Sequence, residues 1–192
     1  LGRQPVTWGT GFLWNPADLF TNFAPNEIDR DTKPSVDVIR TIYYLDTDTS
    51  IDLIGEPLDL NDTMQLRASD SSLAMRAKTH FRESDLSGIV GRIQGDTVIG
   101  GDWASYLADA GWHGEWTYTL AKEVDQQDFF KGVLGIDYSF KTPGELYQAL
   151  EYFYNGLGTH QPETYVTHRN RPAVTRAFER GTAYNLGVHY MG

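Results

Sequence analysis

Alternation of apolar and polar residues at every second position is the feature that most constrains the fold of this 192-residue chain. From Trp112 to Leu120, the even positions are aromatic, aliphatic or glycine, and the odd positions are histidine, glutamate or threonine. The stretches from Phe130 to Phe140 and from Leu73 to Phe81 repeat the pattern. Successive side chains of a strand point to opposite faces, so this alternation with aromatic residues on the apolar face is typical of transmembrane β-barrel strands.

The average composition is that of an ordinary globular chain, with 40% hydrophobic residues and a mean hydropathy of -0.43. The sequence contains no apolar run near the roughly 20 residues that a membrane helix requires. Barrel strands keep the mean hydropathy modest because half of their side chains face water. Eleven tyrosines and five tryptophans suit the aromatic girdles of a barrel at the membrane interfaces.

The net charge of -10 argues against a nucleic-acid partner, because phosphate binding requires clustered lysine and arginine. The absence of cysteine excludes disulfides, thiolate nucleophiles and cysteine-bound metals. Acidic pairs such as Asp29 with Asp31 or Asp46 with Asp48 offer oxygen ligands for calcium, but none has the spacing of an EF-hand. Since Asp is favoured at turns, we interpret these pairs as solvated turn residues and expect no metal.

Ten strand candidates follow from the alternation and from the requirement that short turns and long loops occupy opposite ends of a bacterial barrel. Nine follow directly from the alternation of side chains. A tenth at Thr97 to Leu107 restores the alternation of short turns and long loops if Gly95-Asp96 forms a tight turn. The ten ranges are Arg3–Trp8, Val36–Leu45, Ile51–Glu56, Ser71–Phe81, Leu86–Gln94, Thr97–Leu107, Trp112–Leu120, Phe130–Phe140, Leu146–Asn155 and Ala183–Tyr190. We expect residues 1–192 to form a single outer-membrane β-barrel domain, or an incomplete segment of a larger barrel.

The opening Gly2-Arg3-Gln4, Trp8-Gly9-Thr10-Gly11 and Leu13-Trp14-Asn15-Pro16, followed by Glu27-Ile28-Asp29-Arg30-Asp31, resembles a family of porin-like outer-membrane β-barrels of Gram-negative bacteria. Segments 95–102, 114–118 and 151–156 are similar to the same family, so the resemblance covers about two thirds of the chain. It implies a membrane barrel and leaves the transported solute open. The chain departs from such barrels in ending at Met191-Gly192 rather than on a terminal aromatic residue.

Charged residues on the polar face of the strands are the candidate pore lining. They are Arg76, Lys78, His80, Arg92, His113, Glu115, Lys131, Asp137, Glu151 and His189. In a water-filled channel, these mixed charges would orient polar solutes and tune ion selectivity. In a narrow barrel, the same side chains would pair with one another and close the interior, which is the main alternative.

The loop from Thr10 to Pro34 carries large apolar residues that are costly to leave in water. Its candidate constriction residues are Phe12, Trp14, Asp18, Phe20 and Phe23. Asn15 and Pro16 suit the start of a short helical turn that would continue to Phe20. We expect the loop to fold back into the barrel, and packing against neighbouring loops or a partner subunit is the alternative.

The sequence gives weaker support to two other classes of protein, an enzyme and a soluble β-sandwich. His80, His113 and His189 suggest a barrel enzyme. However, the spacing shows no nucleophile within hydrogen-bond reach of them, and no G-x-S-x-G motif is present. A soluble antiparallel β-sandwich that binds carbohydrate would also alternate, so it stays open. We expect a non-enzymatic outer-membrane channel without a cofactor, which passes small polar or charged solutes. Its partners would be membrane lipid and either further copies or another protein.

Overall fold

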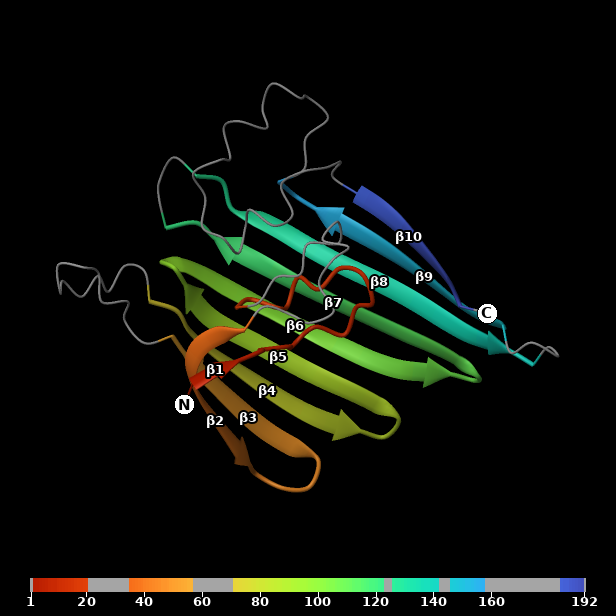
Figure 1. The fold of residues 1–192 in the computed structure, drawn as a ribbon, viewed down its shortest axis with the longest axis horizontal. Coiled ribbons are helices and arrows are strands. Elements are labelled where there is room, and N and C mark those ends of the chain that lie inside the picture. The colour runs from red at the N-terminus through yellow and green to blue at the C-terminus, as the bar shows by residue number, and fades with distance from the viewer. Residues whose placement is uncertain are drawn as a thin grey trace.

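Ten antiparallel strands form one continuous sheet in the part of the chain that the structure describes, which comprises residues 2–20, 35–56, 71–122, 126–141, 146–157 and 184–191. The structure is a computed structural model, and Figure 1 shows its sheet as a single curved layer. In chain order the strands are β1 (Gly2–Gln4), β2 (Val36–Tyr44), β3 (Thr49–Gly55), β4 (Leu73–Phe81), β5 (Ser84–Ile93), β6 (Asp96–Leu107), β7 (Ala110–Leu120), β8 (Phe129–Phe140), β9 (Leu146–Asn155) and β10 (Tyr184–Met191). The predicted all-β antiparallel fold is therefore confirmed.

Each strand pairs with its neighbours in sequence, so the sheet is an up-and-down meander. Among the described residues, β1 and β10 are its two edges and the sheet is open. The strand predicted at Thr97–Leu107 is confirmed as β6, which pairs with β5 from Asp96 to Ser105 and with β7 from Thr97 to Leu107. Antiparallel order places the short connections 45–48, 82–83 and 108–109 at one end of the sheet, where β8 also ends and β9 begins.

The turn between β5 and β6 lies one residue earlier than predicted. Gln94 and Gly95 are its two central residues, with φ values of 50° and 101°, and Asp96 already belongs to β6. Positive φ at both central positions is the signature of the turn that matches the twist of a two-residue hairpin. Gly95 adopts this conformation at no steric cost, which explains the glycine at this position.

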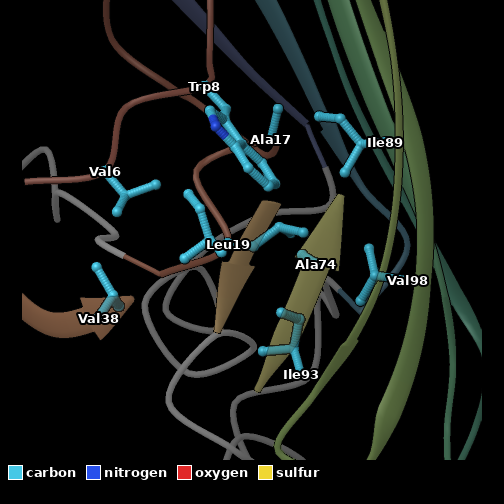
Figure 2. Close-up of a cluster of buried hydrophobic side chains, with 10 residues drawn as sticks. Val6, Trp8, Ala17, Leu19, Val38, Ala74, Ile89, Ile93 and Val98 are labelled. Atoms are coloured by element: carbon cyan, nitrogen blue, oxygen red, sulfur yellow. The ribbon is translucent and has the colours of Figure 1, made fainter. Parts of the chain in front are cut away.

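Residues 5–20 leave the sheet and cross one of its faces, as the red trace in front of the strands in Figure 1 shows. The strand predicted at Arg3–Trp8 is therefore wrong beyond Gln4, because Val6 and Trp8 turn away from β2 and become buried. Figure 2 shows the resulting core, in which side chains of residues 5–20 meet the sheet. This core contains Val6, Trp8, Ala17, Leu19, Val38, Ile54, Ala74, Ile89, Ile93 and Val98.

Candidate functional site

The two faces of the sheet carry different kinds of side chain, with charged groups buried on one face and large apolar groups exposed on the other. The face covered by residues 5–20, called here the inner face, buries charged groups such as Glu115 and Glu151, each 1% exposed. The opposite, outer face exposes large apolar groups, including Trp116 at 36%, Tyr152 at 43% and Leu134 at 55%. Because side chains alternate along each strand, the same strands supply both sets. The predicted alternation is thus present as two chemically distinct faces.

Glu151 on β9 anchors the segment 5–20 through backbone groups. The N–H of Phe12 donates to Oε1 at 2.5 Å, and the N–H of Leu13 donates to Oε2 at 2.8 Å. His113 on β7 places Nε2 at 3.0 Å from Oε1, so three donors from two parts of the chain surround one carboxylate. The His113 ring lies directly over Gly135 of β8, where an added Cβ would approach Nε2 to 2.2 Å. Glycine at this position therefore makes room for the anchoring histidine.

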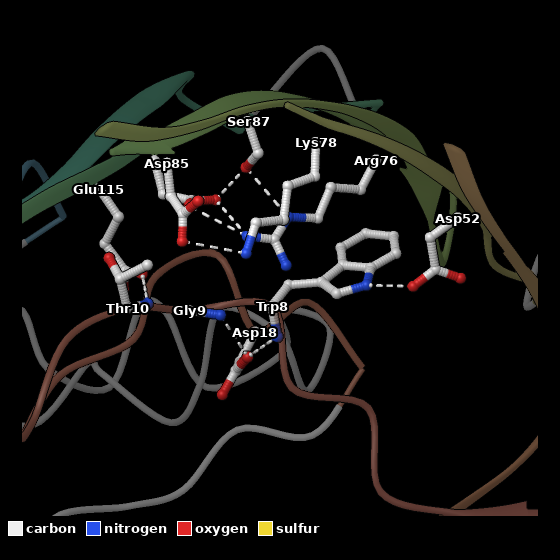
Figure 3. Close-up of polar contacts among 11 residues, drawn as sticks. Trp8, Gly9, Thr10, Asp18, Asp52, Arg76, Lys78, Asp85, Ser87 and Glu115 are labelled. Atoms are coloured by element: carbon white, nitrogen blue, oxygen red, sulfur yellow. Dashed lines mark hydrogen bonds and ion pairs between the residues drawn. The ribbon is translucent and has the colours of Figure 1, made fainter. Parts of the chain in front are cut away.

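Glu115 on β7 provides a second anchor, because its Oε2 accepts the backbone N–H of Thr10 at 2.8 Å. Asp18 stabilises the same segment from within. Its Oδ1 accepts the backbone N–H of Trp8 at 2.6 Å and that of Gly9 at 2.8 Å, which closes residues 8–18 into a loop. Figure 3 shows these contacts beneath the arch of the sheet. Three backbone N–H groups of the segment, those of Thr10, Phe12 and Leu13, thus bond to carboxylates of the sheet.

Trp8 is the third attachment point and links the segment to β2 and β3. Its indole Nε1–H donates to Asp52 Oδ2 at 2.9 Å, while the ring is 1% exposed and Phe20 packs against it edge-on. Asp52 also forms an ion pair with Arg40, whose Nη2 lies 2.6 Å from Oδ2. The carboxylate thus keeps charged and neutral partners on both sides, as a buried acid requires.

Ion pairs run across the inner face from β4 to β6. Arg76 places Nη2 at 2.9 Å from Asp102 Oδ1, and Ser87 bonds to both residues. Lys78 lies at 3.2 Å from Asp85, nearer the end of the strands that carries the short turns. Both bases are paired with an acid on a neighbouring or next-neighbouring strand. This part of the inner face is electrically compensated.

Aromatic contacts hold residues 12 and 14 of the segment against β7 and β9. Phe12 meets the His113 ring edge-on at a centroid distance of 4.9 Å, and Trp14 stacks on Phe153 at 5.6 Å. The helical turn predicted from Pro16 is absent, and residues 16–17 form a simple turn instead. Its closing bond runs from the Asp18 N–H to the Asn15 carbonyl at 3.1 Å, and the Asp18 side chain bonds to the backbone of residues 8 and 9.

Most of the predicted pore-lining residues share the inner face. Arg76, Lys78, His80, His113, Glu115, Lys131, Asp137 and Glu151 lie there by strand parity and by their pairing. His113, Glu115, Lys131 and Glu151 are buried, whereas His80 is exposed and bonds to Asp85 through Nδ1 at 2.9 Å. The structure brings His113, Glu115 and Glu151 together around residues 10–13. It places His80 and Lys78 apart from them, near the turn between β4 and β5.

Arg92 is a correction, because it lies on the outer face. It pairs with Leu73 across β4 and β5 and shares the face of Val90, which is exposed. Its position near the end of β5 lets a long cationic side chain extend from an apolar surface, which explains why a charge is tolerated there. His189 on β10 pairs with Ala149 of β9 in the backbone register.

The predicted constriction residues mostly lie on the inner face with the segment. Asp18 is buried, Trp14 and Phe20 are partly buried, and Phe12 is 49% exposed. Phe23 lies outside the described residues. The loop was expected to fold back into the barrel, and residues 8–20 contact the inner face of a sheet that is open among the described residues.

Several contributors to the site were missed at the sequence level. These are Trp8, Arg40, Asp52, Asp85, Asp96 and Asp102. Strand parity identifies the acids, since Asp52 and Asp102 alternate with apolar outer-face neighbours. No signal marks Trp8, because its burial depends on an excursion from the sheet that strand periodicity does not encode.

Comparison with known proteins finds no matching family model, no matching curated protein and no matching solved structure. Within the described ranges, no three His, Cys, Asp or Glu side chains gather in a way that could hold a metal ion. A helix able to cross a membrane is likewise not found in the part of the chain that was described. The site is therefore defined by its own geometry alone, which is a charged inner face crossed by an anchored segment.

Proposed function

We propose that this chain is a porin-like β-barrel of the outer membrane, or part of one, and that it passes small polar or charged solutes. The observation that carries the proposal is the inverted distribution of side chains between the two faces. Large apolar groups on the outer face match a lipid environment, and ionisable groups on the inner face match a water-containing interior.

The extent of the exposed apolar surface supports the proposal. Large hydrophobic residues are exposed on every strand from β2 to β9, whereas soluble monomers rarely expose contiguous apolar patches beyond a few hundred Å². Aromatic rings also gather on this face, with Trp103 edge-on to Trp112, and Phe130 between Trp116 and Tyr154. Trp and Tyr are enriched where a barrel meets the membrane interfaces.

Membrane insertion requires that the sheet edges be satisfied, because lipid offers no hydrogen-bond partner to a free strand edge. The proposal therefore includes pairing of β1 and β10 with each other or with further strands of a larger barrel. Up-and-down connectivity, in which each strand pairs with its neighbour in sequence, is the topology from which such barrels are built.

Residues 5–20 act as the constriction in this proposal. They are held over the inner face by Asp52, Glu115 and Glu151, and they narrow the interior beside β7 and β9. A long ordered loop anchored at several points is usually functional. Solutes would pass on the side of this segment that faces away from the sheet.

A self-plugged barrel that serves as a scaffold or a partner-binding subunit is the second candidate. The core beneath β2 to β6 favours it, because Val6, Trp8 and Leu19 are buried against that part of the inner face. A soluble carbohydrate-binding sandwich has less support, because a sandwich needs a second sheet packed on the apolar face. Among the described residues, there is one sheet and that face is uncovered.

Electrical recording in planar bilayers tests the proposal, with the whole chain extracted from outer membranes in detergent. A variant that replaces residues 12–20 with a Gly/Ser linker of equal length removes Trp14 and Asp18 and serves as the comparison. We expect the unaltered protein to conduct and the linker variant to show a higher single-channel conductance. If both insert and neither conducts, the self-plugged scaffold is correct. Recovery of the protein as a soluble monomer without detergent overturns the membrane proposal and favours the sandwich.

A further inference from the structure

Charged side chains are rare on the outer face of the sheet. On β1 to β9, strand parity directs three of them outward, which are Arg3 on β1, Asp37 on β2 and Arg92 on β5. Arg3 and Asp37 lie directly opposite each other in the ladder, so their opposite charges compensate each other. Arg92 has no acid on the outer face of its own strand or of β4 and β6, the strands that flank it. It is therefore an isolated cation on this face.

The outward residues around Arg92 are apolar and exposed. Leu73 pairs with it across β4, Val90 precedes it on the same face of β5, and Ile99 lies on that face of β6. An ionisable side chain that faces lipid is costly, and the cost falls toward the membrane interfaces. Arg92 is the last outward residue of β5, so it lies at the rim of the apolar surface. In the proposed membrane orientation, this rim is at the level of the lipid headgroups.

A second cation lies at the same end of the sheet. The exposed Lys122 follows β7, and its Cδ lies 2.7 Å from the position that a Cβ on Gly95 would take, so its side chain runs along the turn that follows Arg92. Asp128, an exposed acid of the same connection, uses Oδ1 to accept the backbone N–H of Ala121 at 2.9 Å. Arg92 and Lys122 form no ion pair with another residue of the described ranges.

The chemistry of this rim favours an anionic phosphate group. A guanidinium presents a planar set of donors that matches two phosphate oxygens, and a neighbouring ammonium adds a further charge. The apolar residues beside Arg92 suit the acyl chains of a lipid, which inorganic phosphate lacks. The chain as a whole carries a net charge of -10, so its average field repels anions. Attraction of an anionic lipid therefore requires these local cations.

We propose that Arg92, assisted by Lys122, binds the phosphate headgroup of an anionic membrane lipid at this rim. The acyl chains of the lipid lie against Leu73, Val90 and Ile99 on the outer face. The inference rests on the membrane location in the proposed function and is independent of whether the interior conducts.

Lipid titration of the whole chain in detergent, followed by native mass spectrometry, tests this inference. The probes are dioleoyl phosphatidylglycerol, which is anionic, and dioleoyl phosphatidylcholine, which has the same acyl chains and no net charge. We expect the anionic lipid to bind more tightly. Arg92→Gln should weaken its binding about five-fold, the effect of one cation beside an anionic headgroup, and leave the neutral lipid unaffected. Arg3→Gln is the matched control, because it removes the same charge from the same face, opposite an acid.

The outcomes separate this inference from the membrane proposal. Weaker phosphatidylglycerol binding in Arg92→Gln alone supports the site. Equal affinity of the unaltered protein for the two lipids, or equal losses in both variants, overturns it. Displacement of the bound lipid by an equal concentration of inorganic phosphate overturns the lipid as occupant, and a dimer that excludes lipid assigns the rim to a second copy. Recovery of the chain as a soluble monomer without detergent overturns the membrane proposal, and the inference falls with it.

Discussion

Glu151 illustrates how a single buried charge organises the inner face. A carboxylate removed from water costs several kcal/mol, of the order given by ion desolvation, unless donors replace the lost solvent. Glu151 recovers this cost through Phe12, Leu13 and His113, which belong to two distant parts of the chain. The residue therefore couples the position of the segment to its own ionised, hydrogen-bonded state.

Replacing this carboxylate by an amide is expected to release the segment. In Glu151→Gln, an NH₂ group replaces one of the two carboxylate oxygens. This group is a donor, so it cannot accept the hydrogen bond of the backbone N–H that it faces. A Phe12→Cys label, unique because the chain has no cysteine, should then react faster with a water-soluble maleimide. The same label with Asp109→Asn provides the control. Equal labelling rates in both backgrounds would show that Glu151 does not hold the segment.

At the scale of elements, the hairpin between β2 and β3 has a turn organised by one aspartate. Asp46 Oδ1 accepts the backbone N–H of Asp48 at 2.8 Å and that of Thr49 at 2.7 Å. The Asp48 N–H, followed by that of Thr49, lowers the pKa of Asp46 below its ordinary value of 3.8. Because the folded-state pKa is lowered, the stabilisation is present above the unfolded value and is lost as the pH falls through the folded one.

The turn should therefore depend on pH through Asp46. Asp46→Ala is expected to lower the thermal stability of the detergent-solubilised protein at pH 7, because the two N–H groups lose their acceptor. The difference from the unaltered protein should shrink as the pH falls below about 4, where the carboxylate becomes protonated. Asp109→Ala, at another turn of the same end, is the control. A difference that stays constant from pH 7 to pH 2 would contradict the ionised role of Asp46.

Strand positions were predictable because two-residue periodicity is a local property. The predicted β9 range matches the structure, and β6 was recovered from the order of long and short connections. Arg92 was misplaced although the parity of Leu86 and Val90 assigns it to the outer face, because its charge was given more weight than its register. The route of residues 5–20 was less predictable, since it depends on Asp52, Glu115 and Glu151, which are distant in sequence.

At the scale of the whole molecule, the proposal makes the outer face a lipid contact. Leu134 is 55% exposed on that face, near the middle of β8. Leu134→Arg should reduce folding stability by about 2–4 kcal/mol in bilayers if the residue lies near the midplane. Reversible urea unfolding in lipid vesicles measures this difference.

Ser139→Arg is the control for this prediction, because Ser139 is exposed on the inner face of the same strand. Val133 would not serve, since it is 1% exposed and packs with Phe153 and Trp14. A cost at Leu134 no greater than that at Ser139 would contradict a lipid-facing outer surface.

The attachment of residues 5–20 also sets an order of assembly. Strand pairing in the sheet joins neighbours in sequence, so each hairpin can form early. The bond between Phe12 and Glu151 instead closes a separation of 139 residues. It requires β9 to be in place, whereas the partner of Trp8 on β3 is available much sooner. If the strands pair in chain order, Trp8 docks before Phe12 and Leu13, whose contacts with β9 form only when nearly the whole sheet has been made.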